Sequence, residues 1–218
     1  MSGALVGLAI LVIGDSHIAS VGHFNDALHE GLVEQGAIVN TFGVCSSLPD
    51  DWIRPSQPIC GRGERHGASP AQLSNNSTLR GWSLPALISS YKPNLVVIEM
   101  GDTLAGYSVT SEMPRELIAK QVADLLQPVR ANKIGCIWVG PPWGTEGGPY
   151  KKTFARVKAV SDYLAQIVTP CRYVNSLLSS RPGEWSTVDG VHLTATSTRL
   201  WDDYIIHAID EIEAPGQR

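Results

Sequence analysis

The stretch ILVIGDSHIAS, residues 10–20, decides the fold prediction for this chain. Four apolar residues run directly into Gly14, Asp15 and Ser16, and a histidine follows. A buried strand that ends on small polar residues is typical of the strand-to-helix turn in α/β proteins. The same residues also suit a simple helix cap, so the stretch alone leaves open whether Ser16 is structural or chemically active.

Apolar runs of strand length recur along the chain, at residues 4–13, 37–43, 95–100, 134–140 and 171–176. They show no strict alternation of apolar and polar residues, so we expect strands that are covered on both faces, as in a parallel sheet. Helices are expected between and after them, at about 18–35, 83–92, 114–131, 150–168 and 194–212. The repeated order of strand and helix predicts a three-layer α/β/α fold with a five-stranded parallel sheet.

Length and composition restrict the classes of protein further. A chain of 218 residues suits one domain, 1–218, in which residues 44–82 lack periodicity and are expected to form a long irregular loop. The 17 Lys and Arg residues face 21 Asp and Glu residues without a basic cluster, which disfavours nucleic-acid binding. The run 4–13 is too short to span a bilayer, so we expect no stable membrane insertion.

The sequence leaves the compartment and the oligomeric state open. No positively charged region precedes the run 4–13, and cleavage after it would fall beside Ser16. We therefore expect a cytoplasmic protein, or a periplasmic or secreted one whose leader lies outside this sequence.

The four cysteines are Cys45, Cys60, Cys136 and Cys171, and their spacing matches no zinc-binding pattern. We interpret Cys136 and Cys171 as buried residues that pack like small apolar side chains. Cys45 and Cys60 bracket a loop rich in Pro, Gly and Asp, where a crosslink would restrain the chain. A Cys45–Cys60 disulfide is therefore one of two open possibilities, and it is favoured if the protein is exported.

A serine at the end of a strand becomes a nucleophile only with a base and an orienting carboxylate. The segment TVDGVHLTATS, residues 187–197, offers Asp189 and His192, three residues apart and just before the last expected helix. Asp189 can fix the tautomer of the imidazole, and His192 can accept the proton of Ser16. A turn or helix cap is the alternative, but strand-end loops of a parallel sheet share one edge, which favours the triad.

Taken together, these residues resemble the SGNH or GDSL hydrolases, serine esterases and lipases with a flavodoxin-like three-layer fold. The nucleophile block of that family is matched by VIGDSH, with Ser16 at the serine, and the last block is matched by Asp189 and His192 in DGVH. The family glycine after the second strand is matched by Gly43 in TFGVCSS. The resemblance implies an oxyanion hole formed by the N–H groups of Ser16 and Gly43.

The third block departs from the family pattern. The family has Gly-x-Asn-Asp after the third strand, whereas this chain has EMGDTLAGY, with Gly101 in place and Thr103 where the asparagine stands. A threonine hydroxyl can donate a hydrogen bond and thus serve as the third oxyanion donor, but it is shorter than asparagine. Asp102 reads as a turn residue, because an ionised carboxylate would repel an oxyanion.

Tryptophans gather in the segments expected near the site: Trp52, Trp82, Trp143 and Trp185. Aromatic faces stack on sugar rings, although burial in the core is the commoner use of tryptophan. We expect Trp143 and Trp185 to be the substrate-binding members of this set.

The resulting prediction is a serine esterase that hydrolyses a small O-acyl ester, O-acetyl above all, on a carbohydrate. The resemblance favours a role in bacterial polysaccharide modification and implies no metal or organic cofactor. A lysophospholipase or thioesterase is the enzymatic alternative, and transfer of the acyl group to a sugar hydroxyl is another. A carbohydrate-binding domain with weak or no turnover is the alternative that Thr103 favours.

Overall fold

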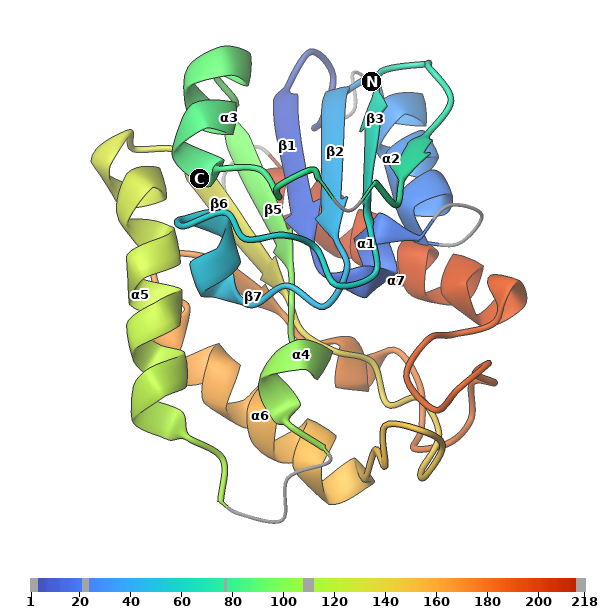
Figure 1. Ribbon diagram of the computed structural model, residues 1–218. Helices are drawn as coiled ribbons and strands as arrows, with labels where there is room; N and C mark the ends of the chain where they lie inside the picture. The colour runs from blue at the N-terminus through green and yellow to red at the C-terminus, as the bar shows by residue number, and fades with distance from the viewer. Residues whose placement is uncertain (1–3, 21–23, 77, 108–111, 215–218) are drawn as a thin grey trace.

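The computed structural model describes residues 4–20, 24–76, 78–107 and 112–214. Over these residues, seven strands form one sheet in the order β4-β3-β2-β1-β5-β6-β7 (Figure 1). The strands are β1 (Ala9–Gly14), β2 (Ile38–Val44), β3 (Arg62–His66), β4 (Gln72–Ser74), β5 (Leu95–Glu99), β6 (Gly135–Val139) and β7 (Arg172–Val174).

The parallel strands confirm the predicted parallel sheet, whereas the strands at one edge of the sheet correct the predicted number of strands. Strands β2, β1, β5, β6 and β7 are parallel, one for each expected apolar run. The expected five-stranded sheet has two additional strands, because β3 and β4 add to the outside of β2 in antiparallel orientation. Both lie in the segment 44–82, which therefore is not irregular throughout.

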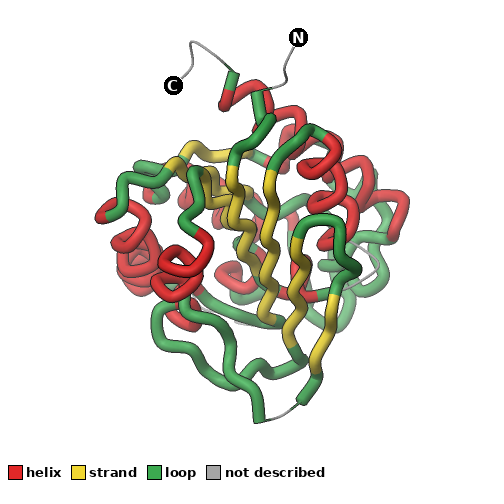
Figure 2. The backbone as a smooth tube through the Cα atoms, turned by 90° about the horizontal axis from the view of Figure 1, so that it is seen from above, coloured by secondary structure: helices red, strands yellow, loops and turns green. Residues whose placement is uncertain are grey.

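Helices cover both faces of the sheet, as Figure 2 shows from above. The helices are α1 (Ser16–Ala19), α2 (Phe24–Glu34), α3 (Leu84–Tyr91), α4 (Asp102–Ala105), α5 (Arg115–Ala131), α6 (Phe154–Ile167) and α7 (Ala195–Glu213), with short 3₁₀ helices η1 (Pro49–Trp52) and η2 (Ser176–Leu178). The single helix expected at 18–35 is divided, because α1 ends at Ala19 and its C-cap residue, Ser20, has an extended backbone. Residues 21–23 of that expectation lie outside the described residues.

Alternate side chains of the central strands enter two different cores, which produces the three layers. Leu11 and Ile13 of β1 pack with the buried residues of α3, α5 and α6. Ile10 and Val12 point the other way and pack with α2 and α7. Because both faces are buried, these strands are continuously apolar, as the sequence indicated. None of the helices over the described residues has the length and apolar character needed to cross a bilayer.

Both pairs of cysteines form disulfides. Cys45–Cys60 connects the end of β2 to the segment before β3, as one of the two sequence alternatives proposed. Cys136–Cys171 connects β6 to the residue before β7, which corrects the expectation of two separate thiols. Both of these cysteines are buried, as expected, but neighbouring parallel strands bring their Cα atoms to 4.4 Å, within the range that a disulfide spans.

Candidate active site

Ser16 lies where β1 ends and α1 begins. Asp15 is the N-cap of α1, and its carboxylate accepts a hydrogen bond from the His17 backbone N–H over 3.1 Å. Gly14 permits this tight turn, since a Cβ there would overlap the side chain of Ile18 and the backbone of Glu99. The sequence Gly-Asp-Ser thus brings the hydroxyl of Ser16 to the carboxyl edge of the sheet, where ligands bind in open α/β folds.

His192 and Asp189 meet Ser16 in one hydrogen-bonded chain. His192 Nε2 lies 2.8 Å from Ser16 Oγ, and Nδ1 lies 2.7 Å from Asp189 Oδ2. The other carboxylate oxygen of Asp189 accepts from the backbone N–H groups of His192 and Val191, at 2.8 and 3.0 Å. Although burial opposes it, these hydrogen bonds from His192 and the backbone lower the pKa of Asp189 below its ordinary value. An ionised Asp189 holds the proton on Nδ1 and leaves Nε2 free to accept the serine proton.

A cavity of about 420 Å³ opens over this chain. Ser16, His192 and Thr103 line it together with apolar and aromatic groups from Leu48, Tyr107, Pro149, Tyr150 and Val191. Its volume falls within the range of sites for small ligands. A reacting ester in this cavity would lie beside both the hydroxyl and the imidazole.

Gly43 does not line this cavity. It lies within β2, between Gly14 of β1 and Gly63 of β3, so its backbone belongs to the sheet. A Cβ at this position would overlap the backbone of Ile18 and Ala19, so the glycine is needed for α1 to pack closely over β2. The expected oxyanion role of Gly43 is therefore not supported by its position.

Ser46, three residues further on, does line the cavity. Its φ of +62° is left-handed, a conformation that glycine adopts freely and other residues adopt rarely. The backbone N–H groups of both neighbouring residues already have acceptors: Cys45 N–H donates to Gly61 O, and Ser47 N–H donates to Val44 O. Over the residues that the structure describes, the Ser46 N–H donates to no protein acceptor. Sequence reasoning missed this residue because a serine gives no signal of a positive φ.

Thr103 reaches the cavity as expected, at the second position of α4. Its hydroxyl donates to Asp15 Oδ2 over 3.3 Å, and so is directed to that carboxylate rather than into the cavity. Asp15 is fully buried, and burial is the main cause that raises its pKa.

Asp102, expected in a turn, is the first residue of α4 and the buried centre of an ionic cluster near Ser16. Lys152 Nζ donates to its Oδ1 over 2.7 Å, and His17 Nε2 lies 3.1 Å from its Oδ2. The Tyr107 hydroxyl also donates to it. Burial alone would raise the pKa of Asp102, but Lys152 and His17 lower it far below the ordinary range. The negative charge that would repel an oxyanion is therefore balanced by Lys152, which is itself fully buried.

Of the described residues, Asp15, His17 and Glu99 have possible metal-ligating atoms within 4.8 Å of one another. All three are buried, and the first two are already hydrogen-bonded, Asp15 to the His17 N–H and His17 to Asp102. Burial and the nearby Asp15 carboxylate raise the pKa of Glu99 well above its ordinary value. We interpret Asp15, His17 and Glu99 as a support for the β1–α1 turn rather than as a metal centre.

None of the four tryptophans expected near the site lines the cavity that holds Ser16, so the structure does not support the expected substrate-binding role of Trp143 and Trp185. Trp185 is buried among residues of α7 and the central strands. Trp143 Nε1 donates to Leu177 O over 2.9 Å, and the ring packs edge-on against Phe154. Trp52 is fully buried, and Trp82 lies under the Arg62 guanidinium. Large rings gain most from burial, and the aromatic groups at the cavity are tyrosines instead.

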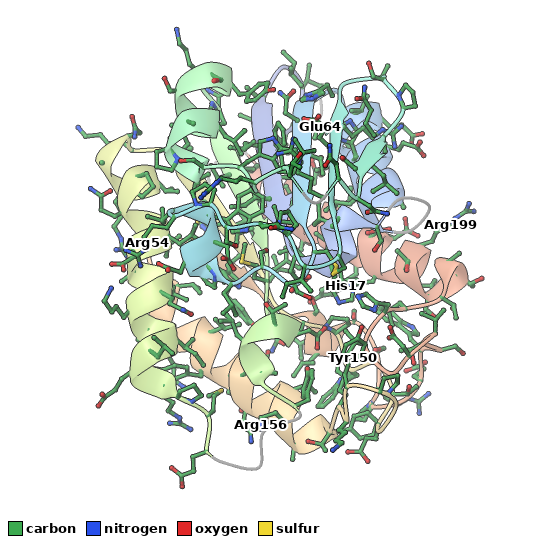
Figure 3. All side chains as sticks on the ribbon, viewed as in Figure 1. His17, Arg54, Glu64, Tyr150, Arg156 and Arg199 are labelled. Carbon is green, nitrogen blue, oxygen red and sulfur yellow. A yellow bond between two sulfur atoms is a disulfide. The ribbon has the colours of Figure 1, made fainter. Side chains whose placement is uncertain are left out.

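Of the two tyrosines that line the cavity, Tyr107 and Tyr150, Tyr150 is the more exposed, at 47%. It lies in a short turn closed by reciprocal backbone hydrogen bonds between Gly147 and Lys152. Its ring is edge-on to the ring of His192, 6.0 Å between centroids. In Figure 3, Tyr150 and His17 lie in the same region, beyond the carboxyl ends of the strands.

The fold matches solved structures along most of the chain. A GDSL-like lipase from Bacteroides thetaiotaomicron is 15% identical and has a TM-score of 0.60, over 93% of this chain and 88% of that one. The acetyl xylan esterase AlAXEase is 14% identical with a TM-score of 0.60, over 93% and 100%. No family model matches the sequence. The fold of this chain is therefore that of solved GDSL-like lipases and related esterases.

At the level of sequence, protein BcsX from Komagataeibacter xylinus is 35% identical over 215 residues, which span 98% of this chain and 81% of that protein. The chain therefore belongs to the family of BcsX.

Proposed function

We propose that this chain is a serine esterase that hydrolyses small O-acyl esters, principally O-acetyl groups on a carbohydrate. The observation that carries the proposal is the hydrogen-bonded chain from Asp189 through His192 to Ser16, at 2.7 and 2.8 Å, beneath the 420 Å³ cavity. Nucleophile, base and orienting carboxylate are within hydrogen-bond reach without rearrangement.

In the proposed reaction, Ser16 Oγ attacks the ester carbonyl while His192 Nε2 accepts its proton. The tetrahedral oxyanion collapses, the alcohol departs with that proton, and an acyl-serine remains. Water, deprotonated by His192, then attacks the acyl-serine, and the acid leaves as Ser16 is reprotonated. Asp189 stabilises the imidazolium in both halves.

The backbone N–H groups of Ser16 and Ser46 are the proposed oxyanion donors. The first amide of a helix has no intrahelical acceptor, which leaves the Ser16 N–H available, and the Ser46 N–H donates to no acceptor of the described residues. Both residues line the cavity, whereas Gly43 does not. This assignment replaces the expected Gly43 with Ser46.

Two features favour a carbohydrate ester as the substrate. The half-exposed ring of Tyr150 stands at the cavity beside His192, where it can stack on a sugar whose ester enters the site. Among similar folds, one protein is an acetyl xylan esterase. A small acyl group also suits a cavity of this volume better than a long chain does.

A second cavity favours the thioesterase or lysophospholipase alternative. It has a volume of about 240 Å³, is lined by apolar groups that include Leu104, Leu117 and Ile118, and shares Thr103 and Gly106 with the first cavity. A longer acyl chain could extend into it from the acyl-serine.

The test is a chain-length series of p-nitrophenyl esters from acetate to dodecanoate, with a Ser16→Ala variant as the reference. We expect kcat/KM to be highest for acetate and to fall by several orders of magnitude in Ser16→Ala. Equal rates for the two proteins would overturn the esterase proposal. A maximum at octanoate or beyond would favour the alternative instead.

The carbohydrate part is tested with acetylated xylan, cellulose and chitin-type oligosaccharides, by measuring released acetate. Tyr150→Ala should raise KM for the preferred oligosaccharide by roughly 2- to 12-fold, the equivalent of 0.5–1.5 kcal/mol of ring contact, and leave p-nitrophenyl acetate unchanged. Tyr150→Phe keeps the ring and should retain the wild-type KM. A parallel loss on both substrates would contradict sugar stacking.

A further inference from the structure

The Cys45–Cys60 disulfide forms part of the wall of the cavity that holds Ser16. Cys45, Ser46 and Cys60 all line that cavity. Ser46 Oγ lies 3.6 Å from Cys60 Sγ, and the Cys45 N–H donates to Gly61 O over 3.0 Å. The bridge therefore ties the turn after β2 to the start of β3, directly beside the residue that we propose as an oxyanion donor.

The turn needs such a restraint because of the backbone of Ser46. A serine with φ of +62° is in a region that L-residues avoid, so other contacts must hold it there. The hydrogen bond from Ser47 N–H to Val44 O closes the turn on one side, and the bridge fixes the other. Because the chain is held on both sides of this turn, relaxation of Ser46 to a right-handed φ would require the Cys45–Ser46 peptide plane to rotate, which would turn the Ser46 N–H in a different direction.

We propose that the Cys45–Cys60 disulfide is a positioning element for the proposed reaction: it holds the Ser46 N–H at the oxyanion, so that full esterase activity requires this bridge to be oxidised. The inference rests on the proposed function and adds redox control to the same site. A dithiol reductant would supply the two electrons and two protons that convert the bridge into two thiols, and would itself become a disulfide.

The two disulfides differ in their access to such a reductant. Cys60 is exposed, whereas Cys136 and Cys171 are both buried. Mild reduction of the folded protein should therefore open Cys45–Cys60 first.

The experiment compares Cys45→Ser/Cys60→Ser, the same variant with Ser46→Gly added, and Cys136→Ala/Cys171→Ala as the matched control that removes the remote bridge. Circular dichroism establishes the temperature at which each is folded, and p-nitrophenyl acetate hydrolysis is measured there. We expect Cys45→Ser/Cys60→Ser to lose kcat by at least about tenfold, up to the roughly 10²–10³-fold typical of a lost oxyanion donor, with kcat and kcat/KM falling together. The control should keep the wild-type kcat.

Adding Ser46→Gly separates positioning from simple stabilisation. Glycine adopts a left-handed φ without strain, so it should restore several-fold of the lost kcat even though it makes the chain more flexible. If the bridge acted only on stability, glycine would lower activity further, and that result would overturn the proposal.

Selective reduction of the wild-type protein gives an independent measurement if the double variant does not fold. Mild reduction followed by alkylation should label Cys45 and Cys60 alone by mass spectrometry, and kcat should fall with the labelled fraction and recover when unalkylated protein is reoxidised. Folded protein labelled at both residues with wild-type kcat would overturn the role of the bridge. A wild-type rate equal to that of Ser16→Ala would instead overturn the proposed function.

Discussion

Thr103 is the residue at which this chain departs most clearly from the SGNH/GDSL pattern that it resembles. Its hydroxyl is directed to Asp15, so the proposed oxyanion site relies on the two backbone amides. We expect Thr103→Asn to retain kcat or raise it by up to about tenfold, since a side-chain amide is longer and can add a third donor.

The readout for Thr103 is kcat for p-nitrophenyl acetate, with Thr103→Val as the control that removes the hydroxyl alone. The valine variant should lose no more than about threefold if the hydroxyl serves Asp15 and not the substrate. A loss of a hundredfold or more in the asparagine variant would show that the threonine has another task.

Asp202, on the buried face of α7, is an acid without a hydrogen-bond partner in the described residues. Burial, and then the Asp203 carboxylate, raise the pKa of Asp202 from an ordinary 3.8 to about 9. Between these values the folded chain holds a proton that the unfolded chain releases. The contribution of Asp202 to stability is therefore complete below about pH 4 and is lost as the pH rises toward 9.

We expect Asp202→Asn to gain stability relative to the wild-type protein between about pH 4.5 and pH 8.5, by more than about 1.4 kcal/mol, the equivalent of one pKa unit. Urea denaturation at both pH values measures the difference in free energy of unfolding. Asp203→Asn, at the exposed neighbouring position, should show a much smaller change. The same difference at both pH values would contradict the raised pKa.

At this scale, the proximity of side chains could be predicted from sequence where residue type and chain order indicate it. Ser16, Asp189 and His192 lie together as their spacing and chain order indicated. The proposed donor at Ser46 was missed because its position depends on a backbone angle that a serine does not reveal. The two tyrosines that line the cavity were missed as well, because the sequence analysis favoured the larger tryptophan rings, and such rings are more often buried.

The turn from Gly147 to Lys152 is the element that presents Tyr150. Its base is held by Lys152, whose buried ammonium donates to Asp102 Oδ1 over 2.7 Å and to Pro142 O over 3.0 Å. Lys152→Met would leave the buried Asp102 carboxylate without its main compensating charge. We expect a loss of about 3–5 kcal/mol in the free energy of unfolding, with a higher KM for the proposed carbohydrate ester because the turn loosens.

Urea denaturation and KM measurements check this prediction, and the exposed neighbour provides the control. Lys151→Met removes a charge from the same turn and should change stability by less than about 0.5 kcal/mol. Similar effects of the two substitutions would show that the buried ion pair does not anchor the turn.

The elements themselves were predictable where they are buried on both faces. The parallel strands and the helices α3, α5, α6 and α7 lie close to the expected ranges, because apolar periodicity and Pro or Gly boundaries mark them. Strands β3 and β4 were not predictable, since RGERH and QLS carry few apolar residues. They are strands because β2 offers them an open edge, a tertiary cause that local sequence does not contain.

Across the whole molecule, the two disulfides close loops of different length. Loop-closure entropy over sequence separations of 35 and 15 residues corresponds to about 4 kcal/mol for Cys136–Cys171 and about 3 kcal/mol for Cys45–Cys60. We expect Cys136→Ala/Cys171→Ala to be the less stable double variant in urea denaturation, while Cys45→Ser/Cys60→Ser is the less active. The opposite order of stabilities would contradict this view.

Two disulfides also favour one of the compartments that the sequence left open. Such bridges form and persist in oxidising surroundings, so we propose that the protein works in the periplasm or outside the cell. Peptide mapping under non-reducing conditions, on protein isolated from its native source, should recover both bridges. Free thiols at all four positions would place it in a reducing compartment instead.

Ser16 and His192 are hydrogen-bonded across 176 residues of sequence. During synthesis Ser16, the proposed nucleophile, leaves the ribosome early, and it does not meet His192, its proposed base, until the segment before α7 has been made and has docked at the sheet edge. No partly made chain can therefore attack an ester by the proposed mechanism. In a translation or refolding experiment, the onset of hydrolysis would time the completion of the fold.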